Sequence, residues 1–262
     1  MLKKLIINAD DFGHTMGVSY GIIEAFQKGV VTSTTALVVS DCFSRSMDVA
    51  NAIAPDLPIG LHLTLTLNQA KPILPKAVVP SLSDENGFFW KQQLFVQKVK
   101  PEEVYLEWEA QILTFLKSGR RPTHLDAHHN AYGKSEALFH VLVALAKKYQ
   151  FPIRNPSRPD TPEALLSLSQ DAGVKMPDLI LPQFYDEGVT FENFTAMLDV
   201  ILQNDGEFFE INVHPAFLEA KVMTLSSYNQ KRLVELELLT SEKFKEALVS
   251  RNILLCSYSV FN

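Results

Sequence analysis

Short apolar segments alternate with longer amphipathic segments along most of this chain of 262 residues. The apolar segments have the length of buried strands, and the amphipathic segments carry apolar residues at helical spacing. The predicted strands span 4–8, 35–39, 59–63, 123–127, 152–154, 179–181, 207–213 and 253–257. The predicted helices span 17–28, 44–54, 101–116, 135–149, 161–170, 191–203, 227–239 and 241–250. This alternation indicates a parallel sheet, either doubly wound or closed into a βα barrel.

Residues 65–100 break the alternation, since they contain several prolines and no clear helical pattern. A connection of this length inside a compact domain usually has a function or small elements of its own. It follows the strand predicted at 59–63, so in a barrel this long insertion loop lies over the catalytic mouth. The chain length suits one barrel, and no linker rich in Gly, Ser or charge divides it. We therefore expect a single domain, residues 1–262, with about seven to eight strands.

Charge and composition exclude several classes of protein. The net charge is −6 and the isoelectric point is near 5.7, which is unlike a nucleic-acid-binding protein. Cys42 and Cys256 match no metal or redox spacing. The apolar run that begins after Lys3 and Lys4 is shorter than the roughly 7–15 residues of a secretory signal. No apolar stretch approaches the roughly 20 residues that span a bilayer. We expect a cytoplasmic protein without a nucleic-acid or membrane partner.

Two adjacent carboxylates, Asp10 and Asp11, follow the first apolar run. Charge at the end of a buried strand is costly unless it is paired or binds a metal. One interpretation is that these residues only cap the following helix, because Asp is a good N-cap. The other is a polar site at the strand end. Adjacent residues point to opposite faces of a regular strand, so a bend near Gly13 is needed to present both carboxylates.

Histidines and carboxylates also occur at the ends of three other predicted strands. His62 lies in the third strand, and His124, Asp126 and His128 alternate at the end of the fourth, so they share one face if that strand stays regular. His214 follows the strand predicted at 207–213. In βα barrels the reacting groups come from the carboxyl ends of several strands, which predicts a metal or acid–base site here.

One Asp and two His form a ligand set with open positions for water and substrate. These ligands suit Zn²⁺, Fe²⁺, Mn²⁺ or Co²⁺. A redox iron site uses the same ligand types, so the ligand types alone leave an oxygenase open.

Several motifs in combination resemble the YdjC-type carbohydrate deacetylases, a family that includes chitooligosaccharide deacetylases. The matching segments are residues 8–13, 32–37, 60–62, 122–129 and 213–217. The resemblance implies a distorted (β/α) TIM-like barrel and one divalent metal ion, magnesium or zinc. It also implies a hydrolase that removes acetyl groups from N-acetylated sugars such as diacetylchitobiose, with a place in chitin degradation and carbohydrate metabolism.

The resemblance also implies roles for particular residues. Asp11, His62 and His128 would bind the metal, Asp10 would be the general base, and His214 would be the general acid.

The chain departs from the family pattern at the end of the fourth strand. The family often continues His-His-His-Val-His, whereas this chain has His128-His129-Asn130-Ala131-Tyr132. The first histidine is kept, so the ligand set is intact. The replaced positions lie near the mouth, where Tyr132 is expected to contact the substrate.

Amide hydrolysis needs a nucleophile, a stabiliser for the oxyanion and a proton for the leaving amine. A metal lowers the pKa of the water that it binds and stabilises the oxyanion. Asp126 and Glu210 are expected to orient histidines, because a metal-binding His usually donates its other N–H. Phe88, Phe89 and Trp90 would either stack on sugar faces or pack the long loop onto the body of the protein.

Two other classes of function stay open. The first is a metal-dependent hydrolase or isomerase that acts on phosphate esters or free sugars. The chain has no Gly-rich phosphate loop, and Arg154 and Arg158 are the basic candidates near a strand end. The second is a non-catalytic sugar-binding protein that holds a metal, although a structural site is normally closed by four protein ligands. The expected partner is a small oligosaccharide, and a homodimer is compatible with the sequence.

Overall fold

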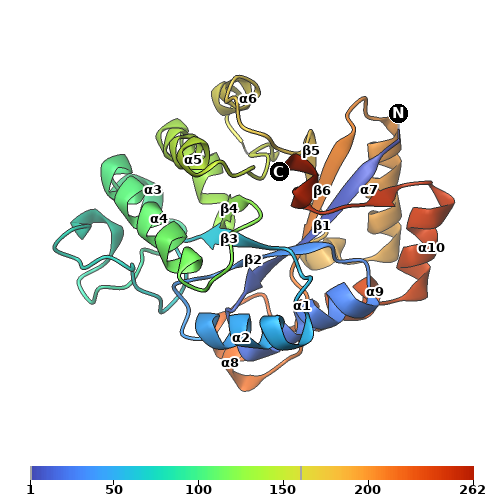
Figure 1. Cartoon of the computed structure of the whole chain (residues 1–262), viewed down its shortest axis with the longest axis horizontal. Coiled ribbons are helices and arrows are strands. Elements are labelled where there is room, and N and C mark those ends of the chain that lie inside the picture. Colours follow the sequence, from blue (N-terminus) through green and yellow to red (C-terminus); the bar gives the residue numbers. More distant parts are fainter. Residues whose placement is uncertain (1, 160) are drawn as a thin grey trace.

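A curled parallel sheet runs through the centre of the molecule (Figure 1). The structure is a computed structural model that describes residues 2–159 and 161–262. The strands are β1 (Lys4–Phe12), β2 (Ser33–Ala36), β3 (Ile59–Leu63), β4 (Leu125–Ala127), β5 (Leu179–Leu181), β6 (Phe208–Val213) and β7 (Leu254–Leu255). Their order is β4-β3-β2-β1-β6-β5, and β7 pairs with the start of β1. All pairs are parallel, which confirms the predicted α/β class.

The chain between β4 and β5 makes the barrel distorted. Ile153 forms an isolated parallel bridge to Leu125 on β4, where the sequence predicted a strand at 152–154. On its other side, the Ile153 N–H donates to the carbonyl of Lys175, 3.0 Å away, and no regular ladder forms there among the described residues. The sheet therefore curls into a half-barrel, which agrees with the predicted distorted TIM-like barrel.

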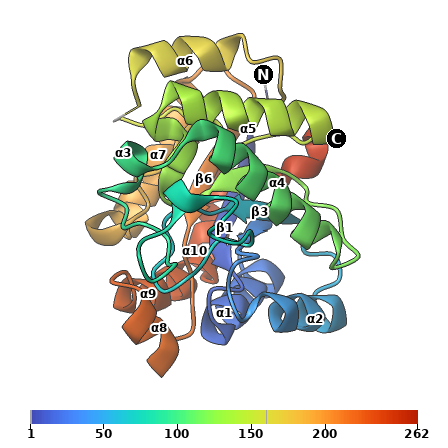
Figure 2. The same cartoon turned by 90° about the vertical axis from the view of Figure 1, so that its left-hand side faces the viewer.

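Helices surround the sheet (Figures 1 and 2). They are α1 (Met16–Lys28), α2 (Phe43–Ile53), α3 (Phe95–Lys98), α4 (Pro101–Leu116), α5 (Glu136–Tyr149), α6 (Glu163–Gln170), α7 (Phe191–Gln203), α8 (Ala220–Leu225), α9 (Gln230–Leu239) and α10 (Glu242–Ser250). Short 3-10 turns η1 (Pro80–Leu82), η2 (His128–Lys134), η3 (Asp186–Gly188) and η4 (Tyr258–Phe261) complete the chain. None of the described helices has the length and apolar character needed to cross a membrane.

Local sequence explains where the main helices begin. Thr15 caps α1 by accepting a hydrogen bond from the Val18 N–H, and Pro101 occupies the first turn of α4.

Two glycines in α1 allow the chain after β6 to lie against that helix. A Cβ on Gly21 would lie 2.5 Å from Ala216 Cα, and the Phe217 N–H donates to the Gly17 carbonyl. This close approach fixes the segment that begins at His214.

The long insertion at 65–100 is ordered and contains η1 and α3. Helix α4 anchors it, because the Glu107 carboxylate accepts hydrogen bonds from the N–H groups of Ile73 and Leu74. Phe89 is buried and belongs to the apolar core. The segment therefore has side-chain packing of its own, as a connection of this length requires.

Candidate active site

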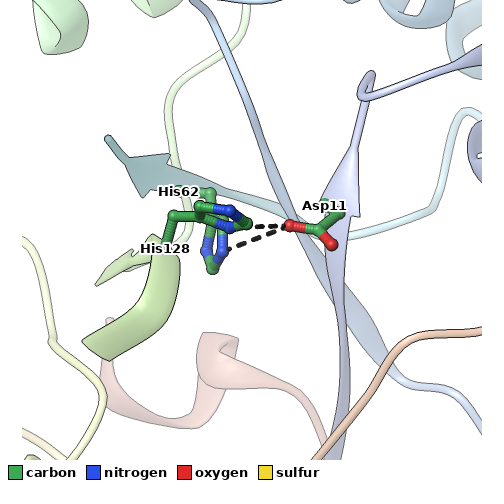
Figure 3. A group of neighbouring side chains, drawn as sticks. All are labelled: Asp11, His62 and His128. Carbon is green, nitrogen blue, oxygen red and sulfur yellow. Dashed lines mark ion pairs between the residues drawn. The ribbon is translucent and has the colours of Figure 1, made fainter. Parts of the chain in front are cut away.

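Three predicted ligands meet at the carboxyl edge of the sheet (Figure 3). Asp11 comes from β1, His62 from β3, and His128 from the first position after β4. Asp11 Oδ1 lies 3.6 Å from His62 Nε2 and 3.0 Å from His128 Nδ1. One potential ligand atom from each residue lies within 4.8 Å of the others. The structure thus brings together Asp11, His62 and His128.

The backbone at Asp11 explains how two adjacent carboxylates both reach the site. Asp11 has a φ of 73°, and the register of β1 with β2 shifts between Ala9 and Phe12. A regular strand would send the two side chains to opposite faces. A left-handed conformation is strained in a residue other than glycine, and such strain is found at functional sites. The bend expected near Gly13 therefore lies at Asp11 itself, with Gly13 also at positive φ.

Arg232 on α9 holds the second oxygen of Asp11. Arg232 Nη2 lies 2.6 Å from Asp11 Oδ2. Burial raises the pKa of Asp11, but the Arg232 cation and then His128 hold that pKa well below its usual range. Asp11 is therefore ionised, with Oδ2 paired and Oδ1 turned toward the histidines.

The surroundings of Asp11 Oδ1 fit a cation. This buried oxygen accepts no hydrogen bond of good geometry from the described residues. Its neighbours are two imidazole nitrogens, which present lone pairs when they are unprotonated. Three acceptors that face one another are stabilised by a positive ion, and the Asp–His–His set suits a divalent metal. The residues present therefore fit the ion that the motifs predict.

Asp126 orients the first of these histidines. Asp126 Oδ1 lies 2.7 Å from His62 Nδ1, and the Thr35 hydroxyl donates to Asp126 Oδ2 over 3.0 Å. Burial lowers the pKa of His62, but the carboxylates of Asp126, Asp10 and Asp11 together more than offset this, so the pKa is raised. The contact leaves His62 Nε2 facing Asp11, as in a metal-binding histidine whose other nitrogen is held by a carboxylate.

Arg154 connects three buried carboxylates below the cluster. It contacts Asp10 through both terminal nitrogens, at 2.6 and 2.8 Å. Its Nη1 also lies 2.8 Å from Asp126 Oδ2, and its Nε lies 2.8 Å from Glu210 Oε1. Burial lowers the pKa of Arg154, but the carboxylates raise it well above its usual range. Removal of one partner from such a network leaves an uncompensated buried charge.

Asp10 is kept ionised by this arginine. Burial raises the pKa of Asp10, but the charge and hydrogen bonds of Arg154 lower it well below its usual range. Asp10, His62 and Asp126 also form a group with ligand-like spacing. The two carboxylates of that group already bind Arg154, so a cation there would face a guanidinium. The Asp11 group is the better candidate metal centre.

Glu210 requires a correction. The sequence predicted that it orients a histidine, but its Oε1 accepts from Arg154 and its Oε2 accepts from the Tyr258 hydroxyl. Burial raises the pKa of Glu210. Its role is to position Arg154, which in turn holds Asp10.

His214 lies beside Asp10, with its Nε2 3.8 Å from Asp10 Oδ2. Its backbone N–H donates to the buried carboxylate of Glu235 on α9. Burial lowers the pKa of His214 to about 4, against the opposing charge of Asp10. His214 is therefore neutral at neutral pH, and the two residues expected to move protons are neighbours.

Two other histidines of the fourth strand end contribute no atom to the cluster. His124 faces the interior, stacked on Tyr258 with 3.5 Å between ring centres. His129 has a φ of 55°, and its Nδ1 lies 2.9 Å from the Thr66 hydroxyl. The expectation that His124 shares a face with Asp126 and His128 depended on a regular strand, and in the structure His124 is used in packing instead.

The expected substrate contacts need correction as well. Tyr132 is 0% exposed, and its hydroxyl donates to the Arg154 carbonyl, so this position does not support contact with a substrate. Phe89 is in the core, and Trp90 Nε1 donates to the Ser81 carbonyl while its ring packs against the core. Phe88 is partly exposed beneath the Lys71 ammonium, which lies 4.8 Å from its ring centre. For Phe89 and Trp90, packing of the long loop is the better interpretation.

Sequence reasoning missed Arg232 and Glu235 and did not assign Arg154 to the site. Arg232 and Glu235 lie one turn apart on α9, in a segment that looks like an ordinary charged helix. The sequence does not reveal that both residues are buried, and two buried ionisable side chains on one helix face indicate a polar site inside the protein. Arg154 follows the irregular segment near 152–154, where the strand pattern was weak.

The fold and the cluster together define a barrel enzyme with a candidate metal centre. The family described as YdjC-like protein matches residues 4–250, and the chain belongs to this family. A relative from Enterococcus faecalis, named carbohydrate deacetylase, is 55% identical over 98% of this chain and 97% of its own. A carbohydrate deacetylase from Geobacillus stearothermophilus is 35% identical over 100% of this chain and 99% of its own. The chain is thus an enzyme of the hydrolase class, which confirms the resemblance.

Solved structures support the same fold. A protein from Enterococcus faecalis V583, whose name proposes cleavage of cellobiose phosphate, superposes with a TM-score of 0.96 and 54% identity over 99% of both chains. An uncharacterised protein from Agrobacterium tumefaciens C58 superposes with a TM-score of 0.56 at 11% identity, over 99% of this chain and 89% of that one. The second likeness concerns the fold alone.

Proposed function

We propose that this chain is a metal-dependent deacetylase that hydrolyses the acetamide of N-acetylated sugars, with chitooligosaccharides such as diacetylchitobiose as substrates. The observation that carries the proposal is the position of Asp11 Oδ1, buried and facing His62 and His128. The names of the two curated relatives support the reaction type.

Asp11, His62 and His128 would hold the ion, which leaves room for other ligands. Two imidazole nitrogens favour zinc over magnesium, because magnesium prefers oxygen ligands. When bound, the ion lowers the pKa of a bound water and polarises the acetyl carbonyl. A structural site would be closed by four protein ligands, so this three-residue set supports catalysis over a purely structural role.

Asp10 and His214 would move the proton between water and the leaving nitrogen. Asp10 is ionised and fixed by Arg154, so it can accept a proton in one orientation. The same pairing weakens its affinity for that proton, and His214 Nε2 is 3.8 Å away. We infer that His214 receives the proton and gives it to the amine nitrogen. Because His214 is neutral at neutral pH, it must gain a proton during the reaction before it can act as the general acid.

A phosphate ester of a sugar is the second candidate substrate. It is favoured by the name of the Enterococcus structure and by Arg158, whose Nε has no hydrogen-bond partner among the described residues. Burial lowers the pKa of Arg158, and the neighbouring Arg154 cation lowers it further. A phosphate near Arg158 would relieve this repulsion. Arg154 cannot serve the same purpose, because three carboxylates occupy it.

The test is a comparison of products from purified protein loaded with a divalent ion. Diacetylchitobiose, cellobiose phosphate and an aryl phosphate are supplied separately, and acetate, free amine and inorganic phosphate are measured. The proposal predicts acetate and free amine in equal amounts from the N-acetylated sugar and no phosphate release. Phosphate release without acetate release would replace it with the second candidate. Binding of sugar without any product would indicate a non-catalytic protein.

A further inference from the structure

An exposed aromatic side chain, Tyr185, stands next to the proposed proton-transfer residues. Tyr185 follows β5 and caps the start of η3, at the same edge of the sheet as the candidate metal centre. Its ring centre lies 5.5 Å from that of His214. The residue is 46% exposed although it touches two other rings. A large aromatic surface is therefore open to solvent beside the reacting groups.

The ring contacts show which face of Tyr185 another aromatic ring covers. Tyr228 stacks on one face, with 4.1 Å between centres and 18° between planes. His214 is nearly equidistant from the two tyrosines, at 5.5 and 5.7 Å, and is inclined by 73° to both. A ring on the outer face of Tyr185 would be much farther from Tyr228, so His214 lies at the edge of the stacked pair. Among the described aromatic rings, none covers the outer face of Tyr185.

The position of Tyr185 is fixed from below. The Tyr228 hydroxyl donates to Glu235 on α9 and accepts from the Asp186 N–H at the start of η3, so it links these two elements. The Arg232 guanidinium lies 5.6 Å from the Tyr228 ring centre and also binds Asp11. One series of contacts thus connects Tyr185 to Asp11. A side chain that is already fixed before the ligand binds loses little conformational freedom on binding.

We propose that the outer face of Tyr185 is a stacking platform for a pyranose ring of the substrate, next to the sugar whose acetamide is hydrolysed. One face of many pyranoses presents C–H bonds, which form an apolar patch that matches an aromatic face, and aromatic rings in binding sites supply this kind of contact. The platform recognises a sugar and not the acetyl group. This inference rests on the proposed function and adds a residue that determines substrate preference.

The test compares Tyr185→Ala, Tyr185→Phe and Tyr185→Trp in the metal-loaded enzyme. The substrates are diacetylchitobiose and a small aryl acetate that carries no sugar. Tyr185→Ala is expected to raise KM for the disaccharide about three- to tenfold with a smaller change in kcat, since it removes binding and not chemistry. The aryl acetate is expected to react at the wild-type rate. Phe and Trp should keep the disaccharide KM within about twofold of wild type.

The matched control is Tyr20→Ala, which removes an exposed tyrosine of α1 that makes no ring contact with the described aromatic residues. It should leave both substrates unchanged. Equal losses on the two substrates in Tyr185→Ala would show that Tyr185 supports the site structurally, and an unchanged disaccharide KM would remove the platform. If the wild-type enzyme releases acetate from the aryl ester but not from the sugar, the proposed function fails instead, independently of Tyr185.

Discussion

Arg232 Nη2 and Asp11 Oδ2 lie 2.6 Å apart, although 221 residues separate them in the chain. Because of this contact, the two oxygens of the Asp11 carboxylate have different partners. Oδ2 neutralises a buried guanidinium, and Oδ1 faces His62 and His128. The left-handed backbone at Asp11 allows both contacts, because it turns the side chain toward the site directly after Asp10. The candidate metal centre therefore depends on helix α9 as well as on the strand ends.

His62→Ala should remove metal and activity together. The substitution removes one of the three potential metal ligands, and it leaves Asp126 without its imidazole partner. Bound metal, measured by elemental analysis after dialysis, should fall well below one equivalent, with acetate release lost in parallel. His140→Ala is the control, because His140 is exposed on α5. Full metal content and full activity in His62→Ala would contradict the assignment.

Asp10→Asn should keep the metal and lose turnover. Asn has nearly the shape of Asp but cannot accept a proton as a base, and a general base contributes about 10²–10⁴-fold to rate. Asp10 does not belong to the Asp11 group, so metal content should match wild type. Loss of the ion in this variant would make Asp10 a ligand. An unchanged kcat would remove Asp10 from the mechanism.

His214→Ala should affect substrates according to their leaving groups. A sugar amine must be protonated to depart, whereas an aryl alcohol leaves with little help. We expect a large loss of kcat on the N-acetylated sugar, a small loss on an aryl acetate, and unchanged metal content. If both substrates lose the same factor, His214 positions the substrate or stabilises the oxyanion and is not the general acid.

Glu235 should make stability depend on pH. Burial raises its pKa to about 7, against the opposing effects of the His214 N–H and the Tyr228 hydroxyl, from an ordinary value of 4.5. The folded state therefore binds the proton more tightly than the unfolded state. This contribution to stability is fully present below about pH 4.5 and is lost as the pH rises through about 7.

Urea unfolding near pH 5 and near pH 8 measures the effect. Glu235→Gln should reduce the fall in unfolding free energy across this window by up to about 3 kcal/mol. Gln keeps an acceptor for the His214 N–H and a polar group for Tyr228. Glu246→Gln, an exposed position on α10, should leave the fall unchanged. The same fall in Glu235→Gln as in wild type would assign the pH dependence to other groups.

Periodicity was enough to predict most of the fold, because most strands and helices bury a local apolar pattern. The weakest prediction was the strand at 152–154, where Ile153 forms only an isolated bridge to Leu125 and one hydrogen bond to the Lys175 carbonyl. Its residues make two backbone hydrogen bonds to Leu125 on one side and one to Lys175 on the other, and no sequence pattern encodes that geometry. The prediction for residues 65–100 missed η1 and α3, because both are too short to show helical periodicity.

The candidate ligands were predictable because they are polar residues at the ends of apolar strands. The residues that position the ligands and the neighbouring Asp10 were not predictable, because each of them pairs with a residue that is remote in sequence. Arg154 is 144 residues from Asp10, and Glu210 belongs with Arg154 and not with a histidine. Tyr132 was assigned to the mouth from its position after His128, but η2 folds back and buries it. Spacing predicts which residues share a strand end, whereas burial and pairing come from tertiary structure.

Acetate release from diacetylchitobiose, measured before chelation, after chelation and after return of a divalent ion, tests the proposed function most directly. The expected result is one acetate for each new free amine, loss of release when the ion is removed, and recovery when zinc or magnesium is restored. The Asp11→Ala variant should fail to recover under the same conditions. Undiminished release by fully metal-free enzyme, or no release by the metal-loaded wild type, would contradict a metal-dependent sugar deacetylase.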